Sequence, residues 1–314
     1  FRGICNPRAR SSEVIDSNKV VVVGGSGFMG SHTADELTKR GFDVTIFDSV
    51  ESQHLNDNQK MIIGDGLDKT QLSRVFEESR YVYHFAGIAD IDEAKIKPSR
   101  TIEVNVMGTT MALEAAIEAE VERFVFASTM YVYSSHGSFY RASKQASERI
   151  IEAYCDEYDL EYTLLRYGSL YGPRSQDWNG LRRYVEQVVK EGRLDYRGSG
   201  KERREYIHVS DAARLSVDIL DDSYKNRAIT VTGHQVLSSK VLIDMIFEIA
   251  GVAHNVNFSE TNTPGDHYET TPYRYTPQRA LKLVPDEFVD IGQGIMDLVE
   301  EIHRLDATKC AVTD

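Results

Sequence analysis

The sequence is poor in cysteine and has no long apolar run. Its cysteines, Cys5, Cys155 and Cys310, are odd in number and lack metal-ligand spacing, so a reduced, cytoplasmic protein without a metal site is expected. No stretch approaches the roughly 18 apolar residues of a membrane span. The polar segment 1–18 has no apolar signal core. We expect it to be a flexible extension outside the fold, either foreign to the natural chain or the remainder of a longer chain.

The chain has fewer positive than negative charges. The chain carries 36 Lys and Arg against 49 Asp and Glu, a net charge of −13. This balance argues against a general binder of nucleic acids or anionic membranes. It does not exclude small anionic substrates, because binding them needs only a few local arginines.

What the sequence does contain is a regular alternation of short β-branched runs with longer helical stretches. Strands are predicted at 20–23, 44–47, 61–63, 81–83, 124–126 and 162–165. Helices are predicted up to about residue 40 and over 99–120 and 141–158. Alternating strands and helices predict an α/β fold with a doubly wound parallel sheet of the Rossmann type.

The strand–helix alternation weakens after residue 172. Helical stretches at 181–191, 211–220 and 239–249 are separated there by short strands and turns. We therefore expect a dinucleotide-binding domain over 19–172, to which later segments return. A smaller mixed α/β substrate lobe is expected mainly over 173–306, followed by a tail over 307–314.

A glycine-rich loop joins the first predicted strand to the first predicted helix. Gly24, Gly27 and Gly30 give the spacing Gly-x-x-Gly-x-x-Gly, with Phe28 and Met29 inside it. Such glycines let backbone N–H groups approach a pyrophosphate at the helix N-terminus. A tight turn without a ligand is the alternative, but the strand before the loop and the amphipathic helix after it favour a dinucleotide.

The second predicted strand ends at Asp48, which Ser49 follows. A carboxylate at this point can accept hydrogen bonds from the ribose hydroxyls of NAD and would repel the 2′-phosphate of NADP. No arginine follows closely. NAD is therefore the expected cofactor, and an aspartate that only caps the loop is the alternative.

Tyr140 and Lys144 lie four residues apart on a predicted helix, which places both on one face. A nearby ammonium favours the phenolate, so the tyrosine can exchange a proton closer to neutral pH than its free pKa of about 10 allows. Such pairs also occur by chance. Together with the glycine loop upstream, this pair indicates hydride and proton transfer.

These features together resemble the extended short-chain dehydrogenase/reductase family, over about residues 19–304. The resemblance is strongest to its nucleotide-sugar epimerase/dehydratase branch, which includes UDP-glucose 4-epimerases. Further motifs of the family follow in order at 64–67, 84–87, 105–109, 165–173 and 204–211. Besides the loop and Asp48, the resemblance implies cofactor contacts from Asp65, Gly66, Phe85, Ala86, Gly87, Asn105, Tyr140, Lys144 and Gly168.

The resemblance also implies catalytic roles. Tyr140 would take the proton of a sugar hydroxyl as hydride leaves the adjacent carbon. Lys144 would lower the pKa of the tyrosine and hold the nicotinamide ribose. Thr129 would orient the reacting oxygen, and the neighbouring Ser128 is the alternative hydroxyl.

For the substrate, the resemblance implies a nucleotide sugar. Arg204 is expected to pair with its diphosphate, because a guanidinium matches phosphate geometry. An ion pair with Glu202 or Glu205 is the alternative for this arginine. Ser169 and Arg274 are further candidates for substrate contacts.

Two departures from the family pattern bear on the reaction. The family's dehydratases carry Asp-Glu after the threonine and its decarboxylases keep a Glu nearby, whereas this chain has Met130 and Tyr131. We therefore expect 4-epimerisation, with an NAD(H)-dependent C4 dehydrogenase or reductase second and a non-catalytic dinucleotide-binding regulatory protein third. The second departure is the short segment 130–139, where we expect substrate choice to be decided. A homodimer through the helices 100–119 and 142–158 is also expected.

Overall fold

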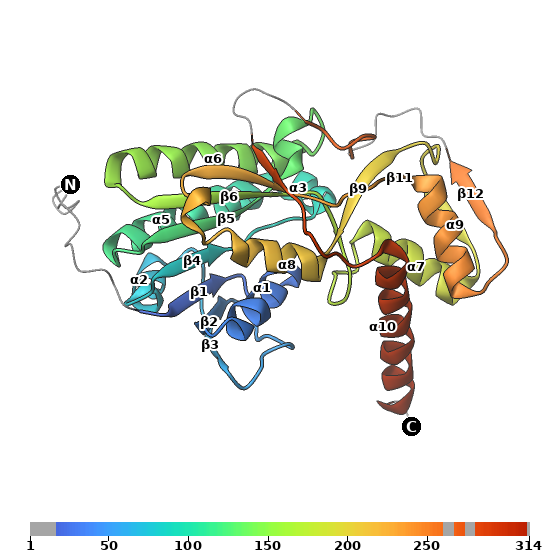
Figure 1. Cartoon of the computed structure of the whole chain (residues 1–314), viewed down its shortest axis with the longest axis horizontal. Coiled ribbons are helices and arrows are strands. Elements are labelled where there is room, and N and C mark those ends of the chain that lie inside the picture. Colours follow the sequence, from blue (N-terminus) through green and yellow to red (C-terminus); the bar gives the residue numbers. More distant parts are fainter. Residues whose placement is uncertain (1–16, 260–266, 274–279, 313–314) are drawn as a thin grey trace. The chain divides into compact units, whose positions relative to one another are not determined.

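The computed structural model describes residues 17–259, 267–273 and 280–312 (Figure 1). Within them the main sheet has eight strands in the order β13-β10-β6-β5-β4-β1-β2-β3. The pairs β1–β2, β2–β3, β1–β4 and β4–β5 are parallel, which confirms the predicted Rossmann-type sheet. The strands are β1 (Lys19–Val23), β2 (Asp43–Asp48), β3 (Gln59–Ile63), β4 (Tyr81–His84), β5 (Arg123–Thr129), β6 (Glu161–Tyr167), β10 (Arg227–Val231) and β13 (Leu281–Leu283).

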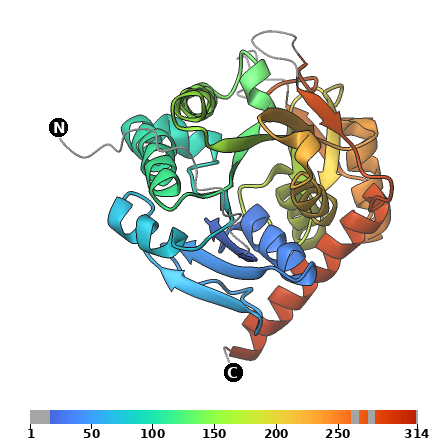
Figure 2. The same cartoon turned by 60° about the vertical axis from the view of Figure 1, so that its left-hand side comes forward.

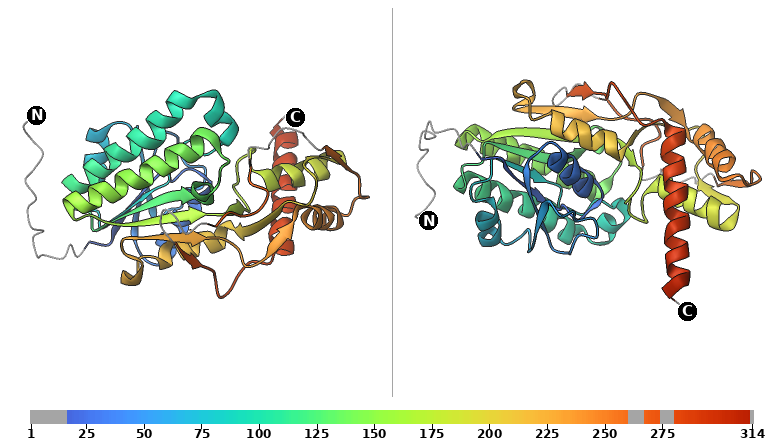
Figure 3. Two further views of the ribbon diagram at one scale, coloured as in Figure 1. Left: turned by 90° about the horizontal axis from the view of Figure 1, so that it is seen from above. Right: turned by 60° about the horizontal axis from the view of Figure 1, so that its bottom comes forward.

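The central strands are largely apolar and buried because helices cover both faces of the sheet. The four valines of β1 are buried, as is typical of a parallel sheet covered on both sides. Helix α1 (Phe28–Lys39) lies on one face (Figure 2). Helices α2 (Lys69–Phe76), α5 (Gly108–Glu118) and α6 (Ser138–Tyr158) cover the other, where α5 and α6, teal and green in Figure 3, run side by side.

The helix predicted over 99–120 is confirmed, with an irregularity inside it. The run is built from α4 (Pro98–Ile102), a π-helical turn η1 (Glu103–Met107) and α5. It follows α3 (Ile91–Ile96). π-Turns are rare and frequent at functional sites, and this one contains Asn105.

The chain divides into two compact units. The first comprises residues 1–128, 138–165 and 217–229, and the second comprises 129–137, 166–216 and 230–314. In the second unit, β11 (Val236–Ser238), β9 (Arg203–His208) and β7 (Ser169–Tyr171) form one small sheet, and β12 (Val256–Ser259) and β8 (Leu194–Arg197) form another. The chain also forms α8 (Val209–Asp218) and two short 3₁₀ turns, η2 (Met130–Tyr133) and η3 (Asp222–Tyr224).

The core of the second unit forms where three helices meet. These are α7 (Gly180–Glu191), α9 (Ser239–Ala250) and α10 (Ile291–Val312), which contact one another. Their buried side chains include Val185, Ile246 and Leu298. α10 covers most of the range 307–314 that the sequence suggested to be a tail. None of the helices in the described ranges is long and apolar enough to cross a membrane.

Candidate active site

The glycine loop after β1 presents backbone rather than side chains at the start of α1. Gly24 has φ +82°, and a Cβ there would lie 2.4 Å from the backbone nitrogen of Ala86. A Cβ on Gly30 would lie 2.3 Å from the Gly24 carbonyl oxygen. Gly27 caps α1 without a side-chain hydrogen bond, and the first turn carries no acidic residue. The loop is thus packed too closely for side chains at these two positions, and the free N–H groups and positive dipole end at the start of α1 suit a pyrophosphate.

Asp48 lies beside this loop at the carboxyl end of β2. Its Oδ2 accepts a hydrogen bond from Ser26 N at 3.0 Å, and its Oδ1 accepts one from Val50 N at 3.3 Å. The Ser49 hydroxyl lies 3.5 Å from the same Oδ1. A carboxylate has about four lone-pair sites, so these contacts orient Asp48 and leave capacity for ribose hydroxyls.

The loop after β3 lies next to Asp48. Gly64 N donates to the Asp48 carbonyl at 2.8 Å. Asp65 has an exposed side chain whose Oδ1 accepts a hydrogen bond from Leu67 N at 2.9 Å, and a Cβ on Gly66 would meet only open space. The predicted residues 65 and 66 therefore lie at the same edge of the sheet as Asp48.

The turn after β4 closes the loop from the other side. Phe85 N and Ala86 N both donate to the Val23 carbonyl, at 2.8 and 3.0 Å. The backbone of Ala86 occupies the space that a side chain on Gly24 would need. The two segments therefore approach each other at backbone distance.

Asn105 fastens the residues after this turn to α6. Its Oδ1 accepts from Ile88 N at 2.7 Å, and its Nδ2 donates to Ile88 O at 3.0 Å and to Ser143 Oγ at 2.9 Å. A Cβ on Gly87 would lie 2.9 Å from this amide and 3.6 Å from Lys144 Nζ. The structure thus brings Gly87, Asn105 and Lys144 together, with the amide engaged by the protein itself.

Lys144 is buried between α6 and β5. It is 4% exposed, its Nζ donates to the Ala127 carbonyl at 2.8 Å, and it lies 4.7 Å from the centre of the Phe126 ring. Burial lowers the pKa of Lys144 to about 8, against the opposing effect of Glu148. The ammonium is still mostly protonated at neutral pH and can favour the phenolate of Tyr140, one turn earlier on α6.

The two candidate hydroxyls at the end of β5 make different hydrogen bonds. Ser128, 3% exposed, donates to Glu148 Oε1 at 2.6 Å. Thr129 Oγ1 instead accepts a hydrogen bond from Tyr131 N at 3.2 Å, at the start of η2. The Ser128 hydroxyl therefore donates its proton to another protein group, whereas the Thr129 hydroxyl acts as an acceptor in its hydrogen bond. This favours Thr129 over Ser128 as the hydroxyl that donates to a substrate.

In the second unit, Arg204 on β9 lies among tyrosines. Its guanidinium carbon is 5.6 Å from the centre of the Tyr268 ring, and Tyr184 and Tyr206 are near enough to interact electrostatically with the guanidinium. Its Nε is buried and has no hydrogen-bond partner among the described residues. A buried guanidinium N–H without an acceptor favours an anionic ligand.

The carboxylates that could have paired with Arg204 bind other groups. Glu205 Oε2 accepts a hydrogen bond from Lys282 Nζ at 2.9 Å. Glu202 Oε1 accepts one from Ser199 N at 2.7 Å. The ion-pair alternative for Arg204 is therefore disfavoured.

The remaining predicted residues of the second unit are placed in part. Ser169 Oγ lies 3.4 Å from the Tyr268 hydroxyl. Gly168 packs so closely that a Cβ would lie 2.4 Å from Thr232 Oγ1. Arg274 lies outside the described residues.

Two features near the predicted residues were not predicted from the sequence: the contacts of Tyr131 with His267 and Tyr268, and the buried carboxylate of Glu148. The Tyr131 hydroxyl lies 2.5 Å from His267 Nδ1, and the rings of Tyr131 and Tyr268 are 4.7 Å apart. The burial of Glu148 was not predicted because a carboxylate on an amphipathic helix usually faces solvent. Only its four-residue spacing from Lys144 could have indicated it.

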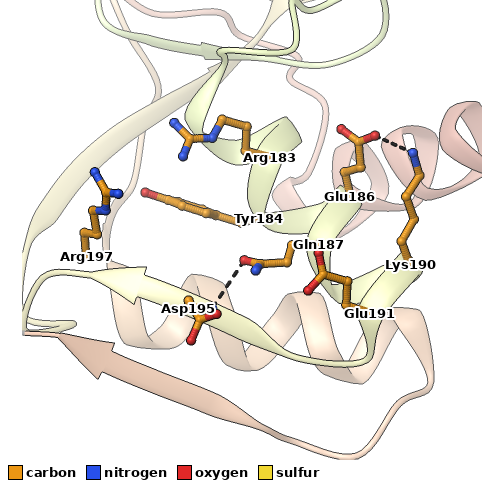
Figure 4. A pocket seen from close by; sticks show the side chains of 8 residues that line it. All are labelled: Arg183, Tyr184, Glu186, Gln187, Lys190, Glu191, Asp195 and Arg197. Carbon is orange, nitrogen blue, oxygen red and sulfur yellow. Dashed lines mark hydrogen bonds and ion pairs between the residues drawn. The ribbon is translucent and has the colours of Figure 1, made fainter. Parts of the chain in front are cut away.

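A surface depression of about 440 Å³ lies between α7 and β8 (Figure 4). None of the predicted site residues that the structure describes lines it. Tyr184 lies between two arginines at one end, and a Glu186–Lys190 pair lies at the other. Its lining residues are Arg183, Tyr184, Glu186, Gln187, Lys190, Glu191, Asp195 and Arg197.

Comparison with known proteins points to one family. The model of the NAD dependent epimerase/dehydratase family matches residues 20–232. The chain is 30% identical to a UDP-N-acetyl-alpha-D-glucosaminuronate decarboxylase of Bacillus cytotoxicus over 68% of this chain and 74% of that protein. It is 27% identical to a putative UDP-glucose 4-epimerase of Methanocaldococcus jannaschii over 72% of this chain and 81% of that protein.

Solved structures show the same fold. The UDP-glucose 4-epimerase of Thermotoga maritima, solved with UDP-glucose, aligns with a TM-score of 0.81 at 24% identity, over 91% of this chain and 99% of that one. The UDP-glucose 4-epimerase of Thermus thermophilus, solved with NAD, aligns with a TM-score of 0.78 at 25% identity and the same coverage.

Proposed function

The chain belongs to the NAD dependent epimerase/dehydratase family, and we propose that it epimerises a nucleotide-activated sugar at C4 by transient hydride abstraction. The observation that carries the proposal is the buried Lys144, held by the Ala127 carbonyl close to Gly87 on the helix that carries Tyr140. Relatives named as UDP-sugar 4-epimerases support the reaction and make UDP-sugars the first substrates to test.

The residues present suit NAD, which is the cofactor of this family. When bound, NAD takes up a hydride from the sugar carbon and returns it. The N–H groups at the start of α1 would hold its pyrophosphate, and Asp48 would accept hydrogen bonds from the adenosine ribose. Lys144 would hold the nicotinamide ribose.

Tyr140 is proposed as the acid and base. It accepts the proton of the sugar hydroxyl and later returns it, a contribution of roughly 10²–10⁴-fold in rate. Lys144 favours the phenolate by its charge. Thr129 is proposed to orient the reacting oxygen with its remaining proton. Arg204 is proposed to bind the diphosphate, with Ser169 and Arg274 contributing to the substrate site.

Epimerisation is favoured over dehydration or decarboxylation by the residues after Thr129. Met130 is fully buried and packs with Val132 and Tyr133. A thioether cannot take or return a proton. The chain therefore lacks at this position the carboxylate that would handle protons at a neighbouring carbon.

The test is incubation of the purified protein with UDP-, GDP-, CDP- and dTDP-sugars, read by mass spectrometry and NMR. We expect a product of unchanged mass with inverted C4, without added NADH. Consumption of NADH with a gain of two hydrogens would instead identify a reductase. Loss of water or CO₂ would contradict the proposal.

We also propose a cytoplasmic homodimer. Ile102 and Met107, on α4 and η1, are 40% and 46% exposed, and apolar side chains of this kind suit a helix-to-helix interface beside α5 and α6. Ile151 of α6, in contrast, is buried. Analytical ultracentrifugation should give twice the chain mass, and a monomer would refute the dimer.

A further inference from the structure

A buried carboxylate lies one helical turn beyond Lys144. Glu148 is 3% exposed and Lys144 is 4% exposed, and their spacing places both on one face of α6. Burying a charge is costly unless it is paired or hydrogen-bonded. Both groups therefore need polar partners inside the protein.

Consecutive residues of β5 bind both groups. Ser128 Oγ donates to Glu148 Oε1 at 2.6 Å, and Lys144 Nζ donates to Ala127 O at 2.8 Å. The ring of Phe126 lies under the ammonium, with Nζ 4.7 Å from its centre. β5 thus holds the carboxylate of Glu148 and the ammonium of Lys144 at adjacent turns of α6.

We propose that Glu148, held by Ser128, is a positioning residue: its charge keeps the Lys144 ammonium protonated and in place, and so sets the pH range in which Tyr140 exchanges a proton. The last step rests on the proposed function. The coupling between Glu148 and Lys144 requires no substrate and can be measured separately.

Other groups near the ammonium do not supply the same charge. His84, on β4, is buried, and burial together with Lys144 lowers the pKa of His84 to about 3, so it is neutral at working pH. Asn105, on η1, is uncharged. Tyr140, one turn earlier on α6, is the proposed acid and base on which the ammonium would act. Glu148 opposes the lowering of the Lys144 pKa by burial.

The test variant is Glu148→Gln, which keeps the shape and an acceptor for Ser128 but removes the charge. Thermal melting is compared with wild type from pH 9 to pH 6, with and without saturating NAD. The unfolded lysine is protonated throughout this range, whereas the folded wild type takes up its Lys144 proton as pH falls through about 8. The variant should take it up only at lower pH, so its deficit in Tm should grow as pH falls.

Turnover gives the second readout. The alkaline limit of kcat/KM should move to lower pH in Glu148→Gln, and a shift of about one pKa unit gives roughly a tenfold loss beyond the wild-type limit. A purely structural role would lower activity equally at all pH. Glu148→Asp retains the charge and should restore most of the wild-type profile.

Glu152→Gln is the matched control, since Glu152 lies one further turn along α6, where its partly buried carboxylate pairs with Arg149 rather than with Lys144 or Ser128. It should show no pH-dependent change. If Glu148→Gln does not fold, Ser128→Ala, which removes one hydrogen bond that holds the carboxylate, should give a smaller shift in the same direction. A Tm deficit independent of pH, or an equal effect in Glu152→Gln, overturns the inference. The expected melting shift in a protein that converts no nucleotide sugar would support it while refuting the proposed function.

Discussion

The two units hold their functional groups in different ways. In the first, backbone atoms fix the groups: Ser26 N binds Asp48, and the Ala127 carbonyl binds Lys144. In the second, aromatic side chains surround Arg204, and its buried Nε has no hydrogen-bond partner among the described residues. The first unit is thus organised before its ligand arrives, whereas the second keeps a donor for a ligand. Cofactor binding should therefore depend on backbone geometry, and substrate binding on individual side chains.

The largest expected effect is on chemistry in the first unit. Tyr140→Phe removes the proton acceptor and should lower kcat by roughly 10²–10⁴-fold. The affinity for NAD, measured by calorimetry, should stay close to wild type. Tyr158→Phe, at the far end of the same helix, is the control and should retain activity. Full turnover by Tyr140→Phe would show that Tyr140 is not the acid and base.

A backbone change in the cofactor loop should come next. Gly30→Ala places a Cβ 2.3 Å from the Gly24 carbonyl oxygen, so the loop must move. Overpacking of this kind costs up to about 3 kcal/mol, and the affinity for NAD should fall about 100-fold. Gly180→Ala in the second unit is the control: its Cβ would lie 3.9 Å from the nearest atom, so the affinity for NAD should not change. Unchanged NAD affinity in Gly30→Ala would show that the loop does not hold the cofactor.

The same contrast explains what could be predicted from the sequence. The first unit follows from local pattern: the valines of β1 predict a buried strand, and the glycine spacing predicts the turn after it. Asp48 and Lys144 follow from their positions relative to those elements. The six predicted strands of the main sheet were confirmed for this reason. The helices 181–191, 211–220 and 239–249, which lie mostly in the second unit, also have a local pattern and were confirmed as well.

Long-range packing could not be predicted in this way. Tyr268 contacts Arg204 and Tyr131 although it lies far from both along the chain. The inward orientation of Glu148 depends on a serine of another element. Neither contact leaves a local periodic signal, since each arises only when distant segments fold together.

A side-chain change in the second unit should affect substrate alone. Arg204→Gln removes the proposed partner of the diphosphate, and a hydrogen bond to a charged group contributes about 2 kcal/mol. KM for the nucleotide sugar should rise about 30-fold, with NAD affinity unchanged. Arg203→Gln is the matched control, because Arg203 is exposed and neighbouring strand residues point to opposite faces. An equal rise in both variants would contradict the role of Arg204.

The smallest expected effect concerns the choice between NAD and NADP. Asp48→Asn keeps an acceptor for Ser26 N but removes the charge that would repel a 2′-phosphate. The ratio of NADP to NAD dissociation constants should fall about tenfold, or about 1.4 kcal/mol. Asp43→Asn, at the opposite end of β2 where Asp43 pairs with Lys60, should leave the ratio unchanged. Because Ser26 keeps its acceptor in Asp48→Asn, a loss of NAD affinity as large as that of Gly30→Ala would mean that the charge of Asp48 contributes as much to cofactor binding as the backbone of the loop does. The backbone of the first unit would then be less independent of its side chains than the comparison with the second unit implies.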